Sequence, residues 1–303
     1  MKMLRDATPA IGDGPALRQM LDTDSYLFFP GLLDRDRIAE VRAAMLGVLE
    51  ADGWLEPGTS PAEAVASALA EPERAPPTEH YFTTYDHIQR LQTFHELVLE
   101  PALVDALSQL FGDPVVAHPM KIARLGVPTP ERWTTPPHQD FPILRSTVDF
   151  VTTWIPLGDC SQELGGLKVL RGSHRRGVLP RLEAVGVGGS GVDHDPESPE
   201  WSSADFSAGD VLVFHSLTIH GAIPNTTDRI RLSADFRFQS VTSPMREFML
   251  HPHYCGQIPD YDVLAEGWTS RRSIEVPPEV PVVANEELGP TEPQLVTVDT
   301  PAS

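Results

Sequence analysis

Residues 209–240, GDVLVFHSLTIHGAIPNTTDRIRLSADFRFQS, decide the fold that we predict for this chain. They hold an apolar β-branched run at 210–214, a turn region rich in Pro, Asn, Thr and Asp, and a second run at 229–240. Short runs of this kind between turn residues are typical of antiparallel strands. Earlier runs with the same character lie at 115–125, 147–157 and 166–170. Because no long helix separates them, we predict a mainly β fold with flanking helices, built on a cupin-like sandwich or jelly roll.

Helical periodicity characterises the chain before residue 112. Apolar residues recur at helical spacing over 15–21, 34–49 and 98–111, and Asp34 stands where it would cap the second helix. We therefore expect a helical part at 15–112 and a jelly-roll core at 114–245 within one domain that spans 1–276. The remainder, 277–303, contains six prolines and several acids, so we expect a disordered C-terminal tail.

The composition narrows the class of partner. With 23 Lys and Arg against 43 Asp and Glu, the formal net charge is −20. A chain this acidic would be repelled by a nucleic-acid backbone or an anionic membrane, so we expect neither as a partner. Two isolated cysteines, Cys160 and Cys255, and the lack of a long apolar run favour a cytoplasmic protein without a disulfide framework.

The strongest chemical signal is the His138-Gln139-Asp140 triplet together with the later His220. On an extended strand, residues two apart point to the same face, so His138 and Asp140 would project side by side. A further imidazole from another strand would complete a facial triad of two histidines and one carboxylate, the ligand set that suits Fe(II) and leaves positions open. By itself an HxD triplet is weak evidence, and a surface His and Asp are the alternative.

Arg231 and Ser233 follow His220 on the next predicted strand. Residues two apart share a strand face, so both side chains would enter the same cavity. A buried guanidinium near a metal binds an anion, and its planar fork matches a carboxylate.

These motifs, in this order and spacing, resemble the phytanoyl-CoA dioxygenase family over about residues 15–250. The matching stretches are Pro-Pro-His-Gln-Asp at 136–140, Trp-Ile-Pro-Leu at 154–157, Gly-Gly-Leu at 165–167, Gly-Ser-His at 172–174, Gly-Asp at 209–210, Phe-His at 214–215, Pro-Asn at 224–225, His220, Arg231 and Ser233.

The resemblance implies a double-stranded β-helix and an Fe(II)- and 2-oxoglutarate-dependent oxygenase. Such an enzyme uses O2 to hydroxylate or otherwise oxidise an unactivated C–H bond, and it releases succinate and CO2. The resemblance makes His138, Asp140 and His220 the iron ligands. Arg231, beside Ser233, would then hold the distal carboxylate of 2-oxoglutarate. Trp154 falls where the family places an aromatic residue near the cosubstrate, although packing in the barrel core is an equal alternative.

The substrate is the least determined part. The candidate substrate residues are Phe141 beside the triad, Trp133 before it and Phe82, with its neighbour Tyr81, ahead of the barrel. Arg124 would grip a carboxylate of the substrate or cosubstrate, unless it is a surface arginine. Many bacterial relatives modify secondary metabolites, which favours a free small molecule. An acyl-CoA hydroxylase of the same family is the alternative, with the arginines at 171–176 as a phosphate site or simply a solvated turn.

Other readings stay open at this stage. A non-redox cupin-type isomerase or a metal-binding protein would use the same ligands but has no evident need for Arg231 with Ser233. Asp140 disfavours halogenation, because related halogenases lack this carboxylate. The stretches 56–79 and 184–203 are candidate lids because they are long and poor in apolar residues. We expect a monomer or a homodimer.

Overall fold

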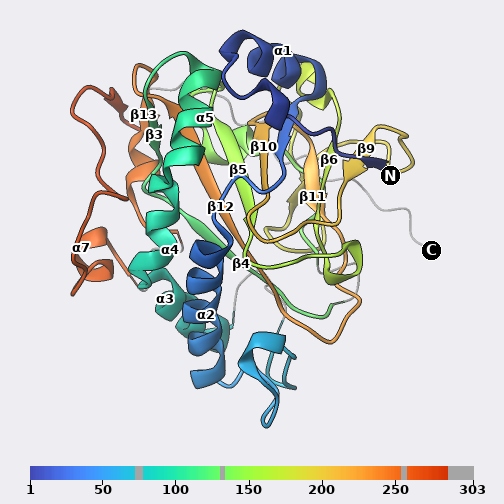
Figure 1. Cartoon of the computed structure of the whole chain (residues 1–303), viewed down its shortest axis with the longest axis vertical. Helices are drawn as coiled ribbons and strands as arrows, with labels where there is room; N and C mark the ends of the chain where they lie inside the picture. The colour runs from blue at the N-terminus through green and yellow to red at the C-terminus, as the bar shows by residue number, and fades with distance from the viewer. Residues whose placement is uncertain (72–77, 130–133, 254–257, 286–303) are drawn as a thin grey trace.

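The computed structural model describes residues 1–71, 78–129, 134–253 and 258–285 (Figure 1). The α-helices are α1 Gly14–Asp24, α2 Arg35–Ala51, α3 Glu79–Gln89, α4 Gln92–Glu96, α5 Pro101–Phe111, α6 Phe141–Leu144 and α7 Tyr261–Leu264. The strands are β1 Lys2–Met3, β2 Tyr26–Phe29, β3 Val115–Ala117, β4 Ile122–Gly126, β5 Val151–Pro156, β6 Leu167–Leu170, β7 Leu182–Glu183, β8 Ser190–Gly191, β9 Trp201–Ser203, β10 Val211–His215, β11 His220–Ala222, β12 Arg231–Ser240, β13 Met245–Arg246 and β14 Val282–Val283. Within these ranges, no helix has the length and apolarity that crossing a bilayer requires.

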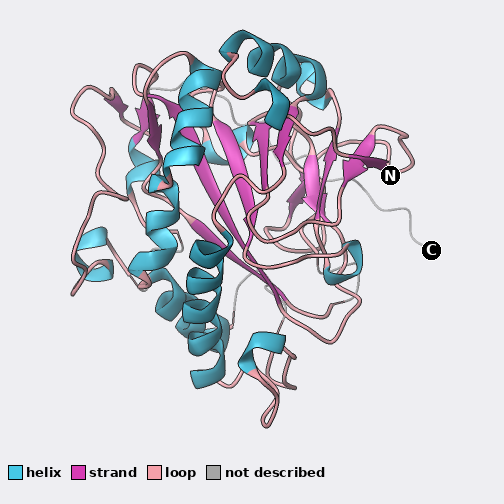
Figure 2. Cartoon of the chain, viewed as in Figure 1, coloured by secondary structure: helices cyan, strands magenta, loops and turns pink. Residues whose placement is uncertain are grey.

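Two sheets form the β core. The larger has the order β2-β10-β5-β12-β3, with β4 also paired to β12, and the smaller has the order β1-β9-β6-β11 (Figure 2). The long crossovers between neighbouring strands and the antiparallel pairing of β10, β5 and β12 give the predicted jelly roll. An apolar layer between the sheets joins Trp154 and Phe214 of the larger sheet to Val169 and Phe206 on the smaller side.

The N-terminal helices cover the other face of the larger sheet (Figure 1). As predicted, the Asp34 carboxylate caps α2 by accepting hydrogen bonds from the amides of Asp36 and Arg37. Apolar residues of α2 and α5 share one cluster with β5, β10 and β12. The helical and sheet parts therefore have a common core.

Alternation along β12 separates two environments. Leu232, Ala234, Phe236 and Phe238 point into the helix-covered cluster. Arg231, Ser233, Asp235 and Arg237 stand between them and project to the opposite face, into the barrel. The run predicted at 229–240 is thus a strand with one apolar and one polar buried face.

Several elements differ from the sequence predictions. The run 115–125 is two strands rather than one, because Pro119 interrupts it and cannot donate a backbone hydrogen bond. Ordered structure also continues past the expected boundary at 276, since β14 pairs with β13 and Val280 is buried. Residues 286–303 of the expected tail lie outside the described residues.

Candidate metal centre and active site

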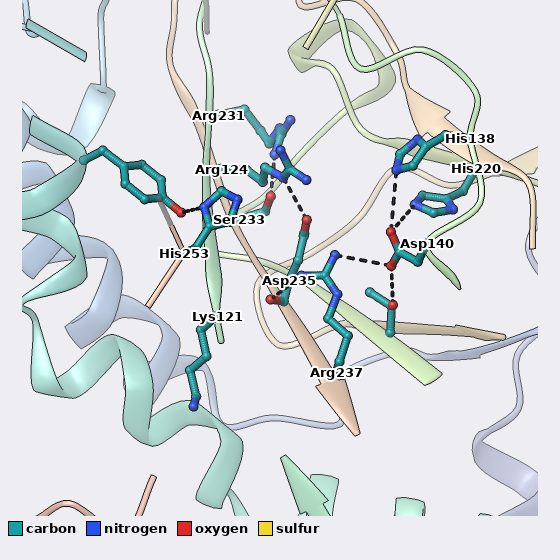
Figure 3. Close-up of polar contacts among 12 residues, drawn as sticks. Lys121, Arg124, His138, Asp140, His220, Arg231, Ser233, Asp235, Arg237 and His253 are labelled. Carbon is teal, nitrogen blue, oxygen red and sulfur yellow. Dashed lines mark hydrogen bonds and ion pairs between the residues drawn. The ribbon is translucent and has the colours of Figure 1, made fainter. Parts of the chain in front are cut away.

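His138, Asp140 and His220 meet at one point of the barrel, with candidate ligand atoms within 4.8 Å of one another (Figure 3). The backbones of His138 and His220 exchange two hydrogen bonds, of 2.9 and 3.0 Å, which join the segment before α6 to β11. The two Nε2 atoms lie 3.6 and 3.7 Å from Asp140 Oδ1. The sequence argument placed His138 and Asp140 on one strand, but Asp140 has helical backbone angles and is the N-cap residue of α6. The antiparallel bridge, together with this turn, brings the three groups together.

Hydrogen bonds to the other ring nitrogens orient both imidazoles. His138 Nδ1 donates to the carbonyl of Pro136 at 2.9 Å, and His220 Nδ1 donates to the carbonyl of Thr218 at 3.0 Å. The lone pair of each Nε2 is therefore directed toward Asp140. Burial and the neighbouring His138 lower the pKa of His220 to about 4. A neutral imidazole is the form that binds a metal.

One carboxylate oxygen of Asp140, Oδ2, accepts hydrogen bonds from neighbouring side chains. Asp140 Oδ2 accepts hydrogen bonds from Thr152 Oγ1 at 2.5 Å and from Arg237 at 3.3 Å, which leaves Oδ1 facing the imidazoles. Burial opposes ionisation, but the Arg237 guanidinium and the two histidines outweigh it and hold the pKa of Asp140 well below its usual range. Two imidazoles and one ionised carboxylate, with second-sphere hydrogen bonds in place, fit Fe(II).

Arg231 is the centre of a second polar group, separate from the triad. It donates to Ser233 Oγ and, through Nε, to the carbonyl of Gly165 at 3.1 Å. Gly126 permits this arrangement, because a Cβ there would lie only 2.9 Å from Arg231 Nε. The guanidinium is buried, and no carboxylate of the described residues lies within ion-pair distance of it. A buried cation in this state fits the distal carboxylate of a dicarboxylic cosubstrate.

Trp154 and Arg124 flank this group. The Trp154 ring centroid is 5.9 Å from the guanidinium carbon of Arg231, while the ring packs edge-on against Phe206. Trp154 thus belongs to the core and also adjoins the anion site. Arg124, on β4, is half-buried and donates to Asp235 Oδ2 at 2.8 Å (Figure 3). It lines both the small pocket at Arg231 and the larger cavity at the triad.

The larger cavity has a volume of about 220 Å³ and opens onto His138 and Asp140. Its apolar lining consists of Met120, Ile122, Ile143, Leu144, Val187 and Phe248. Its nitrogen-bearing lining consists of Arg124, Arg181, Arg237 and His253. His253 contacts the Tyr85 hydroxyl at 2.6 Å, and burial holds the pKa of this histidine well below its usual range. The cavity therefore combines apolar walls with several guanidinium groups.

Of the aromatic residues that we predicted for the substrate, those that the structure describes do not line this cavity. Phe141 adjoins the triad but packs against the apolar cluster of Phe150 and Met249. Phe82 lies on α3 and is absent from the cavity wall, and Tyr81 beside it is buried against Tyr85. Trp133 lies outside the described residues.

Sequence reasoning missed four groups around the site: Thr152, Arg181, Phe248 and His253. Arg237 also reaches the site, and it lies on the same strand as Arg231. Alternation along 229–240 contains the signal for Arg237, because it continues the series of Arg231, Ser233 and Asp235. Thr152 lies on β5 two residues before Trp154, whereas Arg181, Phe248 and His253 come from elements with no such periodicity.

Lys121 is buried and stands in the sequence between Met120 and Ile122, two residues that line the cavity (Figure 3). Its Nζ donates to the carbonyls of Ser273 at 2.7 Å, Pro119 at 3.2 Å and His118 at 3.3 Å. Burial lowers the pKa of Lys121 to about 7. The side chain thus joins the start of β4 to the C-terminal segment.

The arginines at 171–176 have partners within the chain. Arg171 pairs with Asp24 at 2.6 Å, Arg176 pairs with Asp193 at 3.6 Å, and Arg175 donates to the backbone of residues 22–23. These contacts are typical of a structural turn.

The two lid candidates lie in different places. The Gly-rich candidate 184–203 includes β8 and lines the cavity. The described residues of 56–79 contact Asp228 and Arg229 instead.

Known proteins share this architecture. The chain is 29 % identical over 253 residues to 1-deoxypentalenic acid 11-beta-hydroxylase of Streptomyces arenae, covering 78 % of this chain and 85 % of that protein. It is 26 % identical over 247 residues to the peroxisomal phytanoyl-CoA dioxygenase of Rattus norvegicus, covering 76 % and 71 %. The solved epimerase SnoN, in complex with Fe3+, alpha ketoglutarate and nogalamycin RO, matches with a TM-score of 0.54 and 22 % identity over 78 % of this chain and 89 % of that one.

The family model described as phytanoyl-CoA dioxygenase (PhyH) matches residues 21–233, which is more than half of the chain. That range includes the triad, Arg231 and Ser233. The protein therefore belongs to the phytanoyl-CoA dioxygenase family and is an Fe(II)- and 2-oxoglutarate-dependent oxygenase.

Proposed function

We propose that this protein oxidises, most simply by hydroxylation, an unactivated C–H bond of a compact and largely apolar small molecule. His138, Asp140 and His220 hold the iron, and Arg231 with Ser233 holds the distal carboxylate of 2-oxoglutarate. The observation that carries the proposal is that two directed Nε2 atoms and Asp140 Oδ1 face one point on the wall of an apolar cavity.

Iron with 2-oxoglutarate bound supplies the oxidising power: it consumes O2 and releases succinate and CO2. The protein's own contribution is positioning. The carbonyls of Pro136 and Thr218 fix the orientation of the two imidazoles. Thr152 and Arg237 hold Asp140 Oδ2, so that only Oδ1 of this carboxylate faces the imidazoles. Three protein ligands would then leave the other coordination positions of the iron open. The apolar walls exclude water from the reacting bond.

Arg124 has an auxiliary role in this scheme. Its pairing with Asp235 places a neutralised ion pair between Arg231 and Arg237. The pair keeps the Arg124 guanidinium oriented toward both pockets without leaving Arg124 as a further uncompensated cation beside Arg231. We assign Arg124 to the cosubstrate side, with Trp154 as the wall of that pocket.

A free small molecule suits the cavity better than an acyl-CoA thioester. A cavity of 150 Å³ holds benzene, so about 220 Å³ accommodates a compact cyclic or branched molecule. The arginines at 171–176, which would otherwise be available to a CoA phosphate, are engaged within the chain. The relatives that hydroxylate 1-deoxypentalenic acid support a place in secondary metabolism.

Anaerobic titration of the apoprotein with Fe(II) and then 2-oxoglutarate tests the proposal. We expect the weak visible charge-transfer band of a chelated 2-oxo acid, and its absence in His138→Ala. In air, the loaded enzyme should then form succinate. Metal binding without the band and without succinate would contradict the proposal and favour a non-redox isomerase or a binding protein.

A further inference from the structure

The short β7–β8 hairpin, residues 181–191, forms the wall of the cavity next to the metal ligands. Val187 donates its amide to the carbonyl of Thr134 at 3.1 Å, and Val192, just after the hairpin, donates to that of Pro137 at 3.0 Å. Gly186 has a φ of +128°, and a Cβ there would lie 2.1 Å from the Thr134 carbonyl oxygen. The hairpin is therefore held directly against the segment that leads into His138.

This hairpin carries the cavity guanidinium that lacks a counter-ion. Arg124 is paired with Asp235, and Arg237 is paired with Asp140. For Arg181, no carboxylate of the described residues lies within ion-pair distance, although the residue lines the same cavity. Its Nε donates to Ser190 Oγ at 3.0 Å, which orients the planar group and leaves its terminal nitrogens available.

A guanidinium in this setting favours an anionic ligand. It is half-buried beside apolar walls, where a charge is costly unless it is paired. The protein as a whole is strongly acidic, with a net charge of −20, so an unpaired cation in its cavity is not a consequence of overall composition. The planar fork matches the two oxygens of a carboxylate.

We propose that the substrate is a free carboxylic acid and that Arg181, oriented by Ser190, binds its carboxylate. This inference rests on the proposed function and adds a substrate class to it. The acid group lies at the hairpin wall, and the apolar body lies along Ile122, Leu144 and Phe248 toward the triad. A CoA thioester of the same acid lacks the carboxylate, and it would also need room for the CoA group.

The test measures binding to the enzyme loaded with Fe(II) and 2-oxoglutarate in the absence of oxygen. The probes are cyclohexanecarboxylate, its uncharged isostere cyclohexanecarboxamide, and cyclohexanecarbonyl-CoA, each followed by isothermal titration calorimetry. Loading with iron and 2-oxoglutarate is checked first by the charge-transfer band. Failure of the proposed function would therefore appear before any probe is added.

We expect the wild-type enzyme to bind the carboxylate about tenfold or more tightly than the carboxamide, as a charge-assisted pair requires. Arg181→Gln should abolish that preference, and Arg181→Lys should keep part of it because the charge remains without the fork. Arg176→Gln is the matched control, since this nearby arginine pairs with Asp193 on the surface, and it should keep the full preference.

Three outcomes overturn the inference. The first is a correctly loaded wild-type enzyme that does not prefer the carboxylate, including one that binds neither small probe. The second is a preference that survives in Arg181→Gln. The third is tighter binding of the CoA thioester than of the free acid, which would assign the cavity to acyl-CoA substrates.

Discussion

The two faces of β12 are equally buried but have opposite chemistry. None of the residues from Arg231 to Phe238 is more than 8 % exposed. On one face, Leu232, Phe236 and their neighbours pack against the helices and stabilise the fold by removing apolar surface from water. On the other face, Arg231 and Arg237 lose hydration, which must be offset by partners. Burial alone therefore does not distinguish a structural position from a functional one in this barrel.

The partners show how the polar face is tolerated. Arg237 is compensated by Asp140, and Asp235 by Arg124. Among the described residues, the hydrogen-bond partners of Arg231 are only Ser233 and a backbone carbonyl, and neither carries a charge. A charge pair whose members both belong to the chain is complete before any ligand binds, whereas in the proposed function Arg231 is completed by the cosubstrate. Substitutions on the two faces should consequently affect different measurements.

Asp140→Ala should have the largest effect. It removes a metal ligand and leaves the Arg237 guanidinium buried without its carboxylate, so iron binding and stability should both fall. We expect the affinity for iron to drop by more than the roughly 10- to 100-fold that losing an outer-sphere partner costs. Metal analysis after dialysis and thermal unfolding are the measurements. Asp149→Ala, an exposed carboxylate nearby, is the control, and iron retention by Asp140→Ala would contradict the assignment.

Phe236→Ala tests the apolar face. Phe236 is fully buried, with its ring centroid 5.4 Å from that of Phe94, so truncation should cost about 3–5 kcal/mol of unfolding free energy. Below the unfolding transition, the variant should bind Fe(II) and 2-oxoglutarate as the wild type does. Urea unfolding gives the stability, and Phe236→Leu should lose clearly less. A weakened affinity for 2-oxoglutarate in the folded variant would mean that the two faces are coupled.

Arg231→Gln tests the polar face, where we expect cosubstrate preference to change and stability to be retained. The comparison is between 2-oxoglutarate and 2-oxovalerate, which has a methyl group in place of the distal carboxylate. The wild type should prefer 2-oxoglutarate by about 10- to 100-fold, and the variant should lose this preference. Its unfolding midpoint should not fall, because an unpaired buried charge is removed. Arg229→Gln, on the exposed turn before β12, is the control; a retained preference in Arg231→Gln would transfer the role to Arg124 or Arg237.

The difference between the faces also explains what sequence could predict. The strand at 229–240 follows from its alternation, and the triad, Arg231 and Ser233 follow from their residue types together with the resemblance to the phytanoyl-CoA dioxygenase family. The helices α1, α2 and α5 follow from apolar periodicity because each packs one face on the sheet. These features have regular local patterns.

The cavity wall opposite the metal has no such pattern. Arg181 and Ser190 belong to a hairpin of two-residue strands, Phe248 to a 3₁₀ helix, and His253 to an irregular segment. Their approach to the triad depends on long-range packing, which no local period encodes. Phe141 was predicted from its position beside Asp140, but the turn into α6 directs its side chain into an apolar cluster instead.

The smallest predicted effect concerns the far end of the polar face, where His118 contacts Gln239 at 2.7 Å. Burial lowers the pKa of His118 to about 3, so the folded protein keeps it neutral while the unfolded chain titrates near the ordinary value of 6.5. The unfolded state therefore binds more protons than the folded state as the pH falls below 6.5, and this group lowers the free energy of unfolding by up to about 1.4 kcal/mol per pH unit.

Urea unfolding at pH 7.5, 6.0 and 5.0 measures the slope of the unfolding free energy against pH. His118→Gln should make it shallower by that amount, and His251→Gln, an exposed histidine, should not. Because a slope is compared, a constant loss of stability in His118→Gln does not affect the result, and an unchanged slope would show that His118 is not held neutral beside Gln239.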